Sequence, residues 1–462
     1  MSEASFRRFG RLFWYLRLTL SNLVRKFEPT ISKPYIVIKE LQIRPFARPL
    51  LVWIAGIVLQ TVFSCCAYSW VLLLFPVIVL ATACLTQRGQ EHFCYETRWL
   101  WGTVFLSLLL FLSIQKTAYS QFGPSSGHSV SCLSRWAREE QQRLLEPIAK
   151  LNLTDEEKSV LSTITVGYRQ VMNREVRDRF SVTGVAHVLA VSGFHVAIVC
   201  GFLSFLLSFL PRNGFGKWCR YLLNIVLLWI FVAVTGFAVS AVRAGLMLTL
   251  FLSGFVLERQ VERYNILAAS AFGILVYEPL YLFDIGFQLS YLAVFSILYF
   301  QPRLQRLVEI RNPFLLTPWR WITATLSAQV GTTFLSLYYF GRFSTVFLLT
   351  NLPLTLLATL LVPACLIWML LPAGFPGVEW LQVVVEWLAR CLLWTVDSFS
   401  RIPGAFFSFR FGFLMMLMAY GMLLSTILYG HTGRSRYLLV TLFLLLIIFL
   451  VRVIGNLKLC GI

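Results

Sequence analysis

Two histidines and a serine lie close together in a stretch that is otherwise apolar. His187, Ser192 and His195 belong to the run His-Val-Leu-Ala-Val-Ser-Gly-Phe-His, within residues 184–210, which are apolar enough to cross a bilayer. Hydrolases use a serine and a histidine as nucleophile and base, but they also need an orienting acid, and no acid or nucleophile elbow is visible here. We therefore expect no catalytic site.

The position of these side chains in apolar sequence suggests two other roles. Ser192 and Gly193 can interrupt a helix, and Ser192 and His195 can share one face at a spacing of three residues. Hydrocarbon tolerates imidazoles and unwound backbone only where they face protein or water. Both histidines are therefore either hydrogen-bonded structural residues at a helix interface or residues that line a channel.

A second polar group lies in a segment rich in small residues. Ser240 and Arg243 are surrounded by glycine and alanine, which permit close helix contact. An arginine in apolar surroundings must be paired or hydrated. Its partner could be Asp284 or Glu278, or it could meet a passing phosphate.

Further polar residues interrupt later apolar runs. Asp284, Gln288 and Ser290 follow a Glu-Pro pair that alone would indicate an ordinary external turn, but they carry polar chemistry into the next span. Gln329 and Asn351 lie inside later apolar helices. Buried amides serve either as helix-helix hydrogen-bonding groups or as pore contacts, and both readings remain open.

Composition predicts an all-α polytopic membrane protein. Hydrophobic residues make up 58% of the 462 residues and charged residues 13%. The ten cysteines are scattered without metal-ligand spacing, so we expect no metal or other cofactor. About twelve spans are expected, at residues 50–65, 68–86, 100–114, 185–210, 220–237, 240–257, 265–282, 285–301, 321–340, 345–371, 412–430 and 437–454.

The polar segments divide the chain. A capping box at Thr154 starts one helix of a soluble insert, and Val378–Ser398 is predicted to be an interfacial or pore-lining helix. The expected regions are a basic amphipathic leader at 1–48, three spans at 49–115, a soluble helical insert at 116–183, a channel core at 184–410 and C-terminal spans at 411–462.

A net charge of +19 bears on orientation and on partners. Cytoplasmic loops are rich in lysine and arginine, which explains much of the excess and places the N-terminus in the cytoplasm, with no removable signal peptide expected. Sidedness after residue 372 stays open. The leader is expected to lie on membrane lipid, although its basic face could instead guide nucleic acid or dock a motor protein. A positive lining would also suit single-stranded nucleic acid.

Together these motifs resemble the ComEC competence family. The similarity covers about residues 150–410, in the family's order. The segments that carry it are His187–His195, Ser240-x-x-Arg243-Ala244-x-x-Met247, Phe283-Asp-Ile-Gly-Phe-Gln-Leu-Ser290, Leu326-Ser-Ala-Gln329, Tyr339-Phe-Gly341 and Asn351.

The resemblance implies a channel in the bacterial inner membrane that carries single-stranded DNA into the cytoplasm during natural transformation. Relatives also carry an OB-like domain and a metallo-β-lactamase-like domain, which we expect to be absent here, so DNA receptor, nuclease and cytoplasmic motor would be separate proteins. No ATP-binding motif is visible, so energy would come from a partner or a gradient. The alternatives are a permease or exporter of another anionic substrate on the same fold, or a membrane scaffold that transports nothing.

This interpretation predicts a common location for the polar residues. We expect six side chains to converge near the middle of the membrane around a hydrated cavity: His187, Ser192, His195, Arg243, Asp284 and Gln288. Gly193, Ser240, Ser290, Gln329 and Asn351 are further candidates for the path.

Overall fold

The computed structural model describes residues 44–64, 71, 74, 77–78, 98–122, 132–168, 172–211, 213–258, 262–372 and 374–459. Within these ranges the regular secondary structure is helical, apart from one two-stranded sheet. The amphipathic helix predicted for the leader lies outside the described residues, as does most of the span predicted at 68–86. Both remain predictions.

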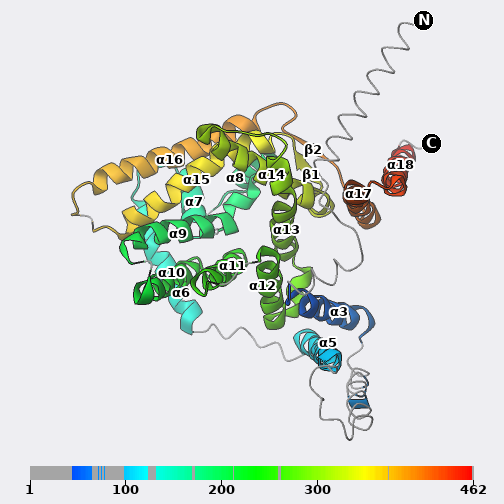
Figure 1. Ribbon diagram of the computed structural model, residues 1–462. Helices are drawn as coiled ribbons and strands as arrows, with labels where there is room; N and C mark the ends of the chain where they lie inside the picture. The colour runs from blue at the N-terminus through cyan, green and yellow to red at the C-terminus, as the bar shows by residue number, and fades with distance from the viewer. Residues whose placement is uncertain are drawn as a thin grey trace, which may run out of the picture.

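The helices follow the apolar segments of the sequence closely (Figure 1). The α-helices are α3 Ala47–Phe63, α5 Arg98–Phe122, α6 Cys132–Ala149, α7 Asp155–Thr165, α8 Arg174–Val182, α9 Gly193–Leu206, α10 Gly214–Val234, α11 Val239–Val256, α12 Arg263–Tyr277, α13 Ile285–Gln305, α14 Pro313–Phe340, α15 Phe347–Leu370, α16 Val378–Ser400, α17 Phe413–Thr432 and α18 Ser435–Leu459. Short 3-10 helices are η2 Ala186–Leu189, η3 Leu207–Phe209 and η4 Pro279–Phe283, and the strands are β1 Arg342–Ser344 and β2 Phe406–Ser408.

Several of these helices are long and apolar enough to cross a membrane. Among the described residues, six helices have the length and hydropathy of a membrane span: α5, α10, α11, α13, α15 and α17. The protein is therefore an all-α polytopic membrane protein, as predicted. The expected number of about twelve spans is not established by this criterion, because α3 and α9 are shorter apolar helices. The predicted span at 265–282 is wrong at its end, since α12 stops at Tyr277 and Pro279 opens η4.

Polar side chains fix where the helices start. The predicted capping box is confirmed: Thr154 accepts a hydrogen bond from the Glu157 backbone N–H, and the Glu157 carboxylate accepts from the Thr154 N–H at 2.8 Å. Asp284 caps α13 by accepting from the Phe287 N–H at 2.7 Å. Asn312 does the same for α14, which begins with a proline.

The segment predicted as a soluble insert packs into the same core as the helices that follow it. Apolar side chains of α7 and α8, such as Leu161 and Phe180, are fully buried in one cluster with residues of α9, α15 and α16. Arg179 of α8 donates to Glu156 at 2.6 Å and to Asp397 of α16 at 2.7 Å. Burial alone lowers the pKa of Arg179, but the two carboxylates outweigh it and the pKa is raised. The division of the chain into separate regions stays a prediction.

Helix α16 packs along α15 and buries one of its faces. Val385, Leu392 and Val396 are fully buried. Three tryptophans at a spacing of seven residues lie exposed on another face: Trp380, Trp387 and Trp394. This amphipathic pattern agrees with the sequence-based expectation of a helix that is not fully exposed to lipid.

Two helix pairs flank the core. The pair α3 and α5 packs against α12, and the pair α17 and α18 packs against α14 (Figure 1). Small residues allow the closest approaches, because a Cβ added to Gly56 would lie 2.6 Å from Ser113. On the other side, Tyr420 of α17 donates to the Gly331 carbonyl of α14 at 2.8 Å.

The helices α13, α14 and α17 define two ends of the bundle. Tyr339, near the end of α14, bonds to Gln288 near the start of α13, whereas Tyr299, late in α13, bonds to His431 late in α17. The starts of α13 and α17 and the end of α14 therefore lie together, next to the sheet. We call this the ribbon end. The opposite, arginine-rich end carries Arg303, Arg306, Arg311, Arg320, Arg434 and Arg436.

Candidate functional site

Five core helices form a closed ring of contacts. In order around the ring they are α9, α11, α13, α14 and α15, and α15 packs back against α9. Most of the predicted site residues lie on these helices or in the turns that lead into them. Polar bonds join neighbouring members of the ring, as the following contacts show.

Ser192 and His195 form a local structure at the start of α9. The chain leaves η2, becomes extended at Ala190 and Ser192, and turns into α9 at Gly193, so the predicted helix break is confirmed. The His195 Nδ1 atom lies 3.1 Å from the Ser192 backbone nitrogen, whose N–H it accepts, and 2.9 Å from the Ser192 hydroxyl. A ring nitrogen that accepts a backbone N–H is unprotonated, which places the proton of the neutral ring on Nε2. His195 is fully buried, and its Nε2 atom has no hydrogen-bond partner.

Helix α11 is tied to this turn by the small residues predicted to allow close contact. Ser240 donates to the Val191 carbonyl at 2.6 Å, which satisfies a backbone group left free by the break before α9. Gly193 also packs toward α11, because a Cβ added there would lie 3.5 Å from the Cβ of Ala244. The turn and the start of α11 therefore form one packed unit.

Arg243 lies one residue before Ala244 and is almost completely buried, with 4% of its surface exposed. Its Nη1 atom is 3.9 Å from the Asp284 Oδ1 atom, which is an ion pair at the limit of direct contact. Neither Nη1 nor Nε has a hydrogen-bond acceptor. Tyr281 and Tyr291 lie within electrostatic range of the same guanidinium. The chain thus holds a buried cation with spare donors.

The sequence offered Asp284 and Glu278 as possible partners of Arg243, and the structure pairs it with Asp284. Glu278 instead accepts from Ser120 of α5 and from the Leu280 N–H. The Asp284 side chain is 48% exposed, although its partner is buried. Gly286 leaves room beside them, since a Cβ there would lie 3.1 Å from the Asp284 Oδ1 atom and 3.5 Å from the Arg243 Nη2 atom. The pair therefore joins a buried cation to an accessible carboxylate.

Gln288 links α13 to α14. Its Nε2 atom donates to the Leu282 carbonyl at 3.0 Å, and its Oε1 atom accepts from the Tyr339 hydroxyl at 3.0 Å. Further along the ring, Asn351 of α15 donates to Thr325 of α14 at 2.7 Å. The amides at 288 and 351 therefore bond between helices.

The remaining candidates occupy intermediate or exposed positions. Gln329 lies one helical turn after Thr325 and is partly exposed, as is Ser290 on α13. His187 lies in η2, is exposed, and donates to the Gly184 carbonyl. It lies within electrostatic range of His195.

The structure brings one subset of the predicted residues together. Contacts connect Ser192, Gly193 and His195 through Ser240 and Arg243 to Asp284, and all of these lie at the starts of their helices. Gln329 and Asn351 lie in a second group, on the α14 and α15 side of the ring. Convergence on a hydrated cavity in mid-membrane stays a prediction.

Several polar partners were missing from the sequence-based site. Tyr281, Tyr291, Tyr339 and Thr325 contact or face the predicted residues, but Tyr291 and Thr325 fell in no motif that the sequence singled out. Tyrosine and threonine are common in apolar helices, so their types alone gave no signal. Their positions one turn away from Gln288 or Gln329 on the same helices could have suggested Tyr291 and Thr325.

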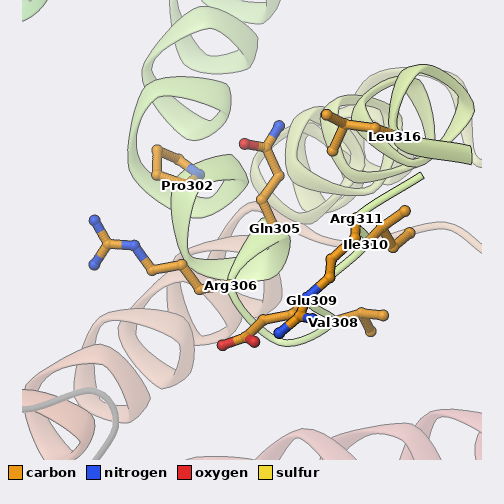
Figure 2. A pocket seen from close by; sticks show the side chains of 8 residues that line it. All are labelled: Pro302, Gln305, Arg306, Val308, Glu309, Ile310, Arg311 and Leu316. Atoms are coloured by element: carbon orange, nitrogen blue, oxygen red, sulfur yellow. The ribbon is translucent and has the colours of Figure 1, made fainter. Parts of the chain in front are cut away.

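A hollow of about 470 Å³ lies at the arginine-rich end. It is lined by the end of α13, the start of α14 and the loop between them, including Arg306, Glu309 and Arg311 (Figure 2). Figure 2 shows Arg306 and Leu316 at different sides of this hollow. Since α13 has 21 residues, the hollow lies about 30 Å from Asp284 and is separate from the predicted site.

Sequence comparison decides the family. The chain matches the family described as Competence protein over residues 164–434, which is more than half of its length. The chain belongs to the competence protein family. The matched region includes every residue of the candidate site, from His187 to Asn351. Membership and the apolar helices together identify a membrane protein associated with competence.

One curated relative supports the same assignment. The chain is similar to "ComE operon protein 3" of Bacillus subtilis (strain 168), with 27% identity over 281 residues. The aligned part covers 56% of this competence protein and 34% of the relative, so the chain spans about a third of the relative's length. No solved structure matches the chain.

Proposed function

We propose that this competence protein takes up DNA during natural transformation, as a channel of the bacterial inner membrane that passes single-stranded DNA into the cytoplasm. Family membership over residues 164–434 supports a role in DNA uptake. The closed ring of helices, with polar residues between its members, supports a path through the protein. Its proposed partners are a DNA receptor, a nuclease and a cytoplasmic motor.

Arg243 carries the proposal. A guanidinium has five N–H donors, and a phosphate is among its best acceptors because it accepts two of them at once. In Arg243 two donor atoms are buried without an acceptor, and the nearest carboxylate oxygen is 3.9 Å away. Such spare donors cost free energy in the empty state and are available to an anion that reaches the site.

Asp284 gives this site a resting partner. Its carboxylate is accessible and only loosely paired with Arg243, so a phosphate at the same place would replace one anion by another. Asp284 also caps α13, which holds it in position while the exchange occurs. We propose that successive phosphates of the strand exchange with Asp284 at Arg243.

Ser192 and His195 have a positioning role in this proposal. The serine hydroxyl lies within hydrogen-bond distance of the imidazole, but the same nitrogen also accepts the serine's own backbone N–H. This is the arrangement of a helix cap, with His195 in the place that glutamate takes in a capping box. We propose that the protein is not an enzyme and that the pair shapes the wall of the path.

The experiment is a transformation assay in a deletion strain complemented with variants. Arg243→Ala should abolish transformation by added DNA while labelled DNA still reaches the periplasm, because the site for phosphate is lost. Arg243→Lys should retain part of the activity, since lysine keeps the charge but loses the bidentate geometry.

Arg220→Ala is the matched control. Arg220 is a partly buried arginine of α10 that bonds to the Ser204 carbonyl and is not part of the ring. It should transform normally at equal protein level and membrane insertion. Normal transformation of the deletion strain would overturn the proposal and favour a permease of another anion or a scaffold. Normal transformation of Arg243→Ala alone would remove Arg243 from the path.

A further inference from the structure

The one sheet among the described residues is an aromatic ribbon, formed by β1 and β2 at the ribbon end. The strands are antiparallel and pair Arg342 with Ser408, Phe343 with Phe407 and Ser344 with Phe406. The Phe409 N–H continues the pairing to the Gly341 carbonyl at 2.8 Å. Figure 1 shows the ribbon beside α8 and α14.

The two faces of the ribbon differ. Directly paired residues point to the same side of a sheet, so Phe343 and Phe407 share one face, with ring centroids 5.2 Å apart. The other face carries Arg342 and Ser408 at one pair and Ser344 and Phe406 at the next, of which Ser344 is buried. Arg410 follows two residues after Ser408, with its side chain beside Gly341. On that face the guanidinium of Arg342 lies 5.7 Å from the centre of the Phe406 ring.

These side chains are accessible. Phe406 is 40% exposed, and Arg342, Arg401 and Arg410 are exposed. Arg342 has one ion-pair partner, the exposed Asp178, at 3.5 Å. Among the described residues, Arg401 and Arg410 form no ion pair. The ribbon therefore presents an accessible aromatic ring beside Arg342, with the exposed Arg410 close by in the chain.

The positive-inside tendency assigns the ribbon to the extracytoplasmic side. Arginines gather at the opposite, arginine-rich end, which the positive-inside tendency assigns to the cytoplasm. Helix α14 connects that end to β1, and α17 returns from β2 to it. Exposed arginines on the outer side oppose this tendency, so it does not account for them. Their unused donors are available to an anionic ligand.

We propose that this face of the ribbon binds single-stranded DNA, with Phe406 stacking on a base and Arg342 and Arg410 contacting phosphates. An aromatic ring beside basic side chains is the combination that holds single strands without reading their sequence. The site rests on the proposed function, for which it would be the outer contact that receives the strand before Arg243.

The test uses the full-length protein in detergent micelles and fluorescence anisotropy of a labelled oligothymidine, measured over a range of salt concentrations. Phe406→Ala and Phe406→Leu should each weaken binding about tenfold, because a lost base stack is worth about that much, and Phe406→Trp should bind normally. Arg410→Ala should lower the slope of log affinity against log salt by about 0.7, the value for one phosphate contact on a single strand.

Phe314→Ala is the control, because Phe314 is 85% exposed and lies at the start of α14, at the arginine-rich end. It should bind like the wild type. If Phe406→Ala and Arg410→Ala bound the oligothymidine as tightly as the wild type, the ribbon site would be overturned. The ribbon site would also be overturned if Phe406→Leu bound normally while Phe406→Ala bound weakly. Any apolar side chain would then suffice, as in a lipid anchor, and no base stacking would be needed.

The outcome is separable from that of the proposed function. If the deletion strain fails to transform but the ribbon variants bind DNA normally, the channel proposal stands and the ribbon site is refuted. If the deletion strain transforms normally and the ribbon variants lose binding, the ribbon is a DNA site but the proposed uptake role is wrong.

Discussion

Gly331 lies where α13 and α14 approach most closely, and adding one methyl group there should destabilise the protein. A Cβ at this position would lie 1.8 Å from the Ser296 hydroxyl oxygen and 2.6 Å from the Ser296 Cβ atom. Rotation of the hydroxyl would relieve the first overlap but not the second. The helices themselves would have to separate, from 2.6 Å to the 3.4 Å at which ordinary contact begins.

The expected cost follows from this displacement. Overpacking by one methyl group in a close-packed core typically costs about 1–3 kcal/mol, and Gly331→Ala should fall at the upper end because backbone must move. The gain in helix propensity from glycine to alanine returns only about 1 kcal/mol. The Tyr420 bond to the Gly331 carbonyl would be disturbed as well.

The assay is thermal unfolding of the purified protein in detergent, in which size-exclusion chromatography measures the folded protein that remains after heating. Gly331→Ala should unfold at lower temperature than the wild type, and Ser296→Gly should rescue it in the double variant, with a coupling energy of about 1 kcal/mol or more. Gly430→Ala in α17 is the matched control, since nothing lies within 4 Å of its added Cβ. Equal stability of Gly331→Ala and wild type, or no rescue by Ser296→Gly, would refute the close-approach argument.

Two further predictions follow from charged contacts. Asp284→Ala should destabilise the protein by about 1 kcal/mol more than Asp284→Asn, because both variants lose the ion pair with Arg243 but asparagine keeps the α13 cap; thermal unfolding compares them, and equal losses would contradict the capping role. The hydrogen bond from Lys217 and its charge lower the pKa of Glu258 below its ordinary value of 4.5. A lowered folded-state pKa stabilises the protein above the unfolded value, so stability should fall as pH drops through the lowered pKa, and Glu258→Gln should lack this component in thermal unfolding at different pH values.

The sequence predicted local features well where one residue type has one physical use. The cap at Thr154 and the break at Ser192 were both predictable, because a capping box needs only four residues and a polar Ser-Gly pair weakens a helix. The apolar runs likewise gave most helix positions. Arg243 was expected to need a partner, and the structure selects Asp284 over Glu278.

Features that depend on distant residues were not predictable. In the sequence, β2 is only an apolar stretch after α16. It forms a strand because its backbone pairs with that of β1, about 60 residues earlier in the chain. The charge-rich insert at 116–183 gave no sign that Phe180 and Leu161 are buried against other helices. The charged residues of a helix indicate which face is exposed, but they do not indicate what its apolar face contacts.

The shortness of α9 bears on how a membrane voltage acts on this protein. Its 14 residues rise about 21 Å, whereas the hydrocarbon core of a bilayer is about 30 Å thick. If water reaches the exposed residues around the break before Gly193, the voltage falls over the shorter distance and the local electric field is stronger. Each phosphate of the proposed cargo that enters a cytoplasm held negative by 100 mV costs about 2.3 kcal/mol. In the proposed channel that cost would be concentrated beside Arg243.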